Sequence, residues 1–124
     1  MRAVLEGVAH RGADLVVAAE ADTGMSIDRL RVDGGMSGNP TFTRALATST
    51  GRPVEVSPVV EATTVGAAFL AGLATGVWGS VEDADRAWTP ARTHAPGPAL
   101  DRAAWARGVE RASGWIPELS ALDV

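Results

Sequence analysis

The chain of 124 residues contains no cysteine and no lysine. Without cysteine it can form neither a disulfide nor a thiolate metal site, and a cytoplasmic location is permitted and expected. Without lysine it cannot contain the Gly-Lys-Ser/Thr end of a Walker A loop. These two absences exclude cysteine-based catalysis and a P-loop nucleotide site.

Long apolar runs and clusters of positive charge are also missing. No segment approaches the roughly 20 apolar residues of a membrane span, and Glu6, His10 and Arg11 interrupt the pattern of a signal peptide. The net charge is −4, and the eleven arginines are scattered along the sequence. We therefore expect neither nucleic acid nor a membrane as a partner.

Apolar periodicity and turn residues predict the secondary structure. Helices are predicted over residues 3–21, 40–49, 63–75, 80–87 and 101–114, strands over residues 30–33 and 53–56, and a loop over residues 92–98. Because a helix joins the two strands, they are predicted to be parallel. The predicted fold class is α/β, with short parallel strands and packed helices.

Several side chains are predicted to face the core. They are Leu5, Val8, Gly12, Leu15 and Ala19 in the first helix, Phe42, Ala45 and Leu46 in the second, and Trp105, Val109 and Ala112 in the last, where Arg102 is predicted to face outward. The four tryptophans, Trp78, Trp88, Trp105 and Trp115, are predicted to anchor the core or an interface, together with Ile116 and Leu119.

The segment LRVDGGMSGNP at positions 30–40 is the most informative part of the sequence. A short strand runs into Gly34 and Gly35, and a helix begins near Asn39. Paired glycines let a ligand approach the main chain, and a helix N-terminus favours phosphate, so this pattern predicts a nucleotide site. A tight strand-to-helix turn without a ligand would give the same pattern. The glycine spacing does not match the Rossmann fingerprint.

Three polar side chains near this segment have competing interpretations. Asn39 stands at a helix N-cap, a role that asparagine fills without any ligand. Asp33 follows the strand, and we interpret it as a turn residue rather than a catalytic carboxylate. Glu61 precedes the helix at 63–75, and we interpret it as a cap. His10 and His94 have no companions at metal-ligand spacing, so no metal site is predicted.

The order of two motifs resembles the C-terminal part of the FGGY carbohydrate kinases, and among them most the glycerol kinases. The first motif is VDGGMSGNP at positions 32–40, and the second is EATTVGAAFLAGLA at positions 61–74, preceded by GRPVEV at positions 51–56. The resemblance covers roughly residues 1 to 115 and implies a partial actin-like ATPase (ribonuclease H-like) domain. It also implies that Gly34, Gly35 and Asn39 bind the adenosine of ATP or ADP.

The same resemblance implies what lies elsewhere. In such kinases the phosphate loops, the magnesium-binding groups, the polyol pocket and the catalytic base are N-terminal to the matched region. Residues 1–124 are therefore expected to form the C-terminal segment of the nucleotide-binding domain, with Mg²⁺, a polyol substrate and the N-terminal part of the kinase as partners. No catalytic residue is assigned, the isolated chain is expected to be inactive, and a homo-oligomer is expected.

Two positions depart from the resembled pattern. Arg44 and Thr48 stand where glycerol kinases commonly carry glutamine and aspartate. A kinase of the same family acting on xylulose or gluconate remains an alternative, as does a non-catalytic module that binds a nucleotide or completes another protein.

Overall fold

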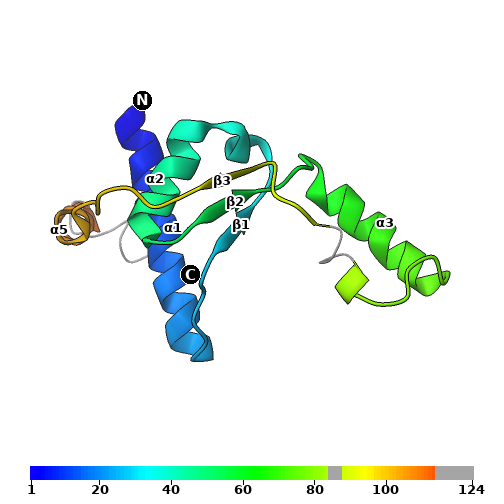
Figure 1. Cartoon of the computed structure of the whole chain (residues 1–124). Coiled ribbons are helices and arrows are strands. Elements are labelled where there is room, and N and C mark those ends of the chain that lie inside the picture. Colours follow the sequence, from blue (N-terminus) through cyan, green and yellow to red (C-terminus); the bar gives the residue numbers. More distant parts are fainter. Residues whose placement is uncertain (84–87, 114–124) are drawn as a thin grey trace.

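The computed structural model describes residues 1–83 and 88–113 of the chain. Its elements are α1 (Arg2–Thr23), β1 (Leu30–Val32), the 3-10 turn η1 (Gly35–Gly38), α2 (Pro40–Thr50), β2 (Val54–Val56), α3 (Ala62–Ala74), β3 (Arg92–His94) and α5 (Arg102–Ser113). Helices α1 and α2 pack against each other beside a small sheet, and α3 projects away from them (Figure 1).

The sheet has three strands in the order β1-β2-β3. Strands β1 and β2 are parallel, with Leu30 opposite Val54, as the sequence predicts. Strand β3 runs antiparallel to β2, with His94 opposite Val54, so the loop predicted over residues 92–98 is wrong in its first half. Its prolines begin only at Pro96, beyond the strand, and they leave the N–H groups of β3 available for pairing.

The predicted helix and strand ends in the described residues lie within two residues of the observed ones. Gly24 and Gly51 end α1 and α2 in the left-handed conformation, at φ 68° and 67°. The helix predicted over residues 80–87 extends beyond the described residues. At its start, a carboxylate oxygen of Asp83 accepts hydrogen bonds from the Gly79 and Ser80 amides, which is the acidic half of a capping box.

The core lies between α1, α2 and the sheet. It consists of Ala9, Leu46, Ala47 and Val54, with Leu30, Val32, Phe42 and Ala45 packed against it, so the predicted inner face of α2 is confirmed.

The predicted inner face of α1 is correct for Gly12, which lies against α2, and for the half-buried Leu5, but wrong for Val8, Leu15 and Ala19, which are exposed. Helix α1 buries Ala9, Ala13 and Val16, whereas Leu15 is 68% exposed. The helices meet closely along small side chains: a Cβ added at Gly12 would lie 2.8 Å from Leu46 Cδ1. Close contact between α1 and α2 therefore selects the alanine-rich face rather than the face with the larger aliphatic residues.

Helix α5 lies against α1 through Trp105, which is half-buried as predicted. Arg102 was expected to face outward but is half-buried against α1, while Ala112 is exposed. Trp115, Ile116 and Leu119 lie outside the described residues. Among the helices of the described part of the chain, none has the length and apolar character needed to cross a bilayer.

Candidate functional site

The turn after β1 is held by its own main chain. Gly34 has φ 79° and ψ 179°, a conformation that residues with a Cβ atom rarely adopt. Its carbonyl oxygen accepts hydrogen bonds from the Ser37 amide at 3.1 Å and the Ser37 hydroxyl at 2.7 Å. The backbone amide of Asn39 then donates to the Met36 carbonyl at 3.0 Å. Gly34 is therefore required by the turn itself.

Gly35 is required by nothing in the described part of the fold. It is exposed, its φ is not positive, and a Cβ placed on it would meet no atom within 4 Å. Neither the backbone conformation nor packing within the described residues requires glycine at position 35. Because Gly35 has no side chain, the main chain at the end of β1 is left uncovered.

Asn39 caps α2. Its side-chain oxygen accepts hydrogen bonds from the Thr41 amide at 2.9 Å and the Phe42 amide at 3.4 Å. Because two N–H groups require an acceptor, the oxygen must face the helix and the side-chain amide group must face away. That Nδ2 group has no partner among residues 1–83 and 88–113, and Asn39 is exposed. One side chain can therefore cap the helix and still donate a hydrogen bond outward.

The acidic residues beside this turn make few contacts. Asp33 lies between β1 and η1, at the turn as interpreted from the sequence, but it is exposed and its side chain forms no hydrogen bond with the residues that the structure describes. Glu61 occupies the N-cap position of α3, as predicted, but its side chain accepts no capping hydrogen bond. Within the described ranges, no group of three or more His, Asp or Glu side chains could hold a metal ion.

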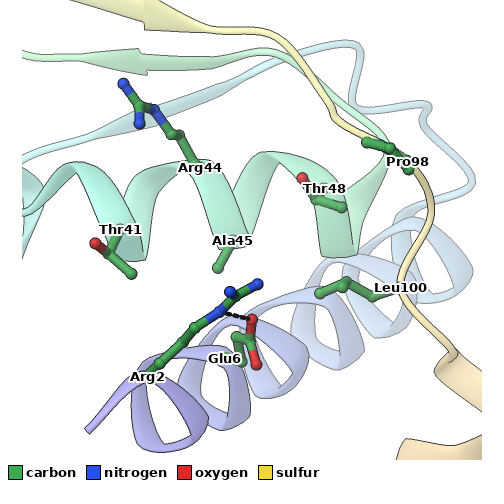
Figure 2. Close-up of a pocket in the computed structure, with 8 residues that line it drawn as sticks. All are labelled: Arg2, Glu6, Thr41, Arg44, Ala45, Thr48, Pro98 and Leu100. Carbon is green, nitrogen blue, oxygen red and sulfur yellow. Dashed lines mark hydrogen bonds and ion pairs between the residues drawn. The ribbon is translucent and has the colours of Figure 1, made fainter.

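A hollow of about 560 Å³ lies further along α2, between that helix, the start of α1 and residues 98–100 (Figure 2). Its lining residues are Arg2, Glu6, Thr41, Arg44, Ala45, Thr48, Pro98 and Leu100, and they do not include the glycine pair or Asn39. Both departures from the resembled pattern, Arg44 and Thr48, therefore line this hollow.

The two departures play different parts there. The Thr48 hydroxyl accepts a hydrogen bond from the Gly97 amide at 3.1 Å, which ties the segment after β3 to α2. Arg44 points away from Arg2 and Glu6, towards the strands (Figure 2). Burial, and then the positive charges of Arg44 and Arg92, lower the pKa of His94 below its usual value.

A polar cluster that the sequence analysis missed joins α5 to α1. The Arg102 guanidinium donates to His10 Nδ1 and to the His10 carbonyl, both at 2.9 Å, and to a carboxylate oxygen of Asp14. The Trp105 indole N–H donates to the other Asp14 oxygen at 3.1 Å, and the Trp105 ring stacks on His10 with centroids 5.0 Å apart. The partners in each of these contacts between α1 and α5 are about 90 positions apart in the chain, so no local pattern could reveal the cluster.

The cluster sets the charge states of its members. Burial, and then the positive charge of Arg102, lower the pKa of His10, and its Nδ1 accepts a hydrogen bond only in the neutral form. Burial by itself would raise the pKa of Asp14, but hydrogen bonds from Trp105 and Arg102 outweigh it and the pKa is lowered. A neutral imidazole and an ionised carboxylate therefore hold one guanidinium between them.

Comparisons with known proteins place these features in a family. Residues 1–75 match the model described as "FGGY family of carbohydrate kinases, C-terminal domain". A glycerol kinase of Symbiobacterium thermophilum is 42% identical over an alignment of 122 positions that covers 94% of this chain and 24% of that protein. A glycerol kinase of Rhodopirellula baltica is 37% identical over 98% of this chain and 24% of its own length.

Solved structures agree with the sequence relatives. A Plasmodium falciparum glycerol kinase, solved with ADP, matches 99% of this chain with a TM-score of 0.71 and 28% identity, and the match covers 24% of that protein. A gluconate kinase from Lactobacillus acidophilus matches 97% of this chain with a TM-score of 0.68, but at 19% identity it shows the shared fold alone.

The chain thus spans about a quarter of the length of the curated relatives that it matches. The match to the family model includes α1, β1, the glycine turn, α2, β2 and α3. This chain belongs to the FGGY family of carbohydrate kinases, within their C-terminal domain.

Proposed function

We propose that residues 1–124 form the C-terminal segment of the nucleotide-binding domain of a glycerol kinase, an enzyme that transfers phosphate from ATP to glycerol and yields glycerol 3-phosphate. The observation that carries the proposal is 37–42% identity to glycerol kinases of several bacteria over nearly the whole chain. A gluconate or xylulose kinase receives less support, because its likeness is confined to the fold.

Within that function, we assign Gly34, Gly35 and Asn39 to the adenosine of ATP or ADP. Gly34 supports this role by shaping the turn, and Gly35 supports it by leaving main chain uncovered. The outward Nδ2 group of Asn39 would donate to an acceptor atom of the nucleoside while the oxygen keeps its place on α2. The related structure from Plasmodium falciparum was solved with ADP.

The remaining parts of a kinase site would come from the other three-quarters of such an enzyme. Phosphoryl transfer depends on positioned phosphate contacts, Mg²⁺ and a group that orients the attacking hydroxyl. The described residues offer no metal cluster, so Mg²⁺ would be held elsewhere, and we expect the isolated chain not to phosphorylate glycerol. The oligomeric state of the complete enzyme stays a prediction.

The direct test is a chimera in which this chain replaces the matched C-terminal quarter of the Symbiobacterium thermophilum glycerol kinase. We expect ATP-dependent phosphorylation of glycerol by the chimera, and none by either part alone. A folded chimera that does not phosphorylate glycerol would contradict the assignment.

A further inference from the structure

Helix α3 is apolar on every side. No charged residue occurs from position 62 to position 81, so the helix and the turn after it form one uncharged stretch between Glu61 and Glu82. A water-exposed helix of a globular protein normally has a polar face, and one that is apolar all round is normally buried. In the described part of the chain α3 nonetheless projects away from the sheet and from α1 and α2 (Figure 1).

Among the residues that the structure describes, only those on one side of α3 cover the helix. The Trp78 ring lies over Gly72, where an added Cβ would be 2.5 Å from the indole, and it also contacts Phe69 with ring centroids 5.7 Å apart. The opposite side is the open face, which we define by residues that are all exposed and recur at helical spacing: Thr63, Ala67, Leu70, Ala71 and Ala74.

The open face has a shape suited to close packing. Leu70 is its one large side chain and is 65% exposed, while its neighbours are alanines and a threonine. Small side chains allow a neighbouring helix or sheet to approach closely, and a single large side chain in their midst can fill a matching pocket. The absence of charge implies that the opposing surface is apolar as well.

The comparisons identify what could lie opposite this face. The chain as a whole has a fold similar to part of a much longer kinase, because the Plasmodium falciparum structure matches 99% of this chain with a TM-score of 0.71. This chain spans only 24% of that protein, so three-quarters of such an enzyme are available to cover α3. Burial of α3 against those other parts of a longer protein would explain why the helix is apolar.

We infer that the open face of α3 is the docking surface for the larger, N-terminal part of a glycerol-kinase-like protein, with Leu70 as its central anchor. This inference rests on the proposed function for the identity of the partner. It adds the face through which the partner is held and the side chain on which that contact most depends.

Hydrogen exchange tests the docking without any need for catalysis. It compares this chain alone with the chimera that joins it to the N-terminal three-quarters of the Symbiobacterium thermophilum glycerol kinase. The backbone amides of α3 should exchange about tenfold or more slowly in the chimera, whereas those of the α1–α2 core should change much less. Equal exchange of α3 in the two proteins would overturn the inference.

A matched pair of substitutions locates the surface. Leu70→Glu and Leu15→Glu each place a carboxylate on a helix position that is exposed to a similar degree, 65% and 68%. In the chimera Leu70→Glu should lower the melting temperature by about 5 °C or more, and Leu15→Glu by clearly less. In the chain alone both should have small effects. Equal losses in the chimera would remove α3 as the specific surface.

Two further outcomes separate this inference from its alternatives. If the chain alone forms a dimer that Leu70→Glu dissociates, the occupant of the face is a second copy and the inference is wrong. If the chimera protects α3 but phosphorylates no substrate, the docking surface stands and the proposed function fails. If the chimera is active but α3 is not protected from exchange, the proposed function stands and the docking surface is wrong.

Discussion

Two regions of this chain place their apolar side chains in opposite surroundings. In the body, formed by α1, α2 and the sheet, apolar side chains of one element meet those of another and enclose Ala9, Ala47 and Val54. In the arm, formed by α3 and the turn that follows, apolar side chains meet mainly Trp78 and solvent. The body supplies its own cover, whereas the arm requires cover from outside the described residues. The arm also differs in composition, because residues 62–81 contain no charged side chain whereas α1 contains several.

The largest expected difference in stability is between substitutions in the core of the body and substitutions in the arm. Leu46→Ala removes a buried side chain between α1 and α2 and should cost about 2–5 kcal/mol of the free energy of unfolding. Leu70→Ala removes an exposed side chain from the chain alone and should cost at most about 0.5 kcal/mol. Urea unfolding followed by circular dichroism measures both. Similar costs for the two variants would mean that α3 is packed in solution.

A smaller loss should appear where α5 joins the body. Arg102→Ala removes the hydrogen bonds to His10 Nδ1, the His10 carbonyl and Asp14, and leaves these three acceptors without that donor. We expect a loss of about 1–3 kcal/mol, and faster hydrogen exchange across α5. Arg107→Ala is the matched control, because Arg107 is exposed on the same helix. Equal exchange of α5 in the two variants would show that the cluster does not hold this helix.

The two glycines of the turn should respond differently to alanine. Gly34→Ala forces a side chain into a conformation with φ 79° and should cost about 1–3 kcal/mol of stability. Gly35→Ala meets no neighbouring atom and should change stability by less than about 0.5 kcal/mol. Thermal unfolding of the two variants checks this contrast. If Gly35→Ala were the more harmful of the two, the exposed turn would have a different structure in solution.

Lowering the pH should decrease the free energy of unfolding of the body, where both histidines lie. We expect this to be the smallest of the four effects. The pKa values of His10 and His94 are lowered in the folded chain, so the unfolded chain binds more protons as the pH falls below about 6.5. Stability is therefore greatest above that pH and decreases as the pH falls through the folded-state values. Unfolding at pH 7.5 and 5.5 measures this, and His10→Phe should reduce the difference. An increase in stability at pH 5.5 would contradict the assigned charge states.

Much of the local structure could be predicted from the sequence. Gly24, Gly51 and Pro40 mark helix boundaries through their own conformational limits, and the structure agrees with those boundaries. The N-cap role of Asn39 was also predictable, because it depends on residues two and three positions away. Such features are determined within a few residues of the chain.

Features that depend on distant partners could not be predicted in the same way. Strand β3 exists because residues 92–94 pair with β2, and nothing within RTH itself indicates a strand. The buried face of α1 is set by the close approach of α2, and Arg102 finds its partners about 90 residues away. The adenosine role of the glycine turn stays a prediction, since the residues that could complete such a site belong to the rest of a kinase.

The central claim is that Asn39 binds a nucleoside through its outward amide group while its oxygen caps α2. Calorimetric titration of the chimera with ADP tests it through Asn39→Asp and Asn39→Ser, which keep a capping oxygen but remove the Nδ2 donor. We predict that both variants retain the stability of the parent and bind ADP about tenfold or more weakly. Unchanged ADP affinity in both variants would show that Asn39 serves the helix alone.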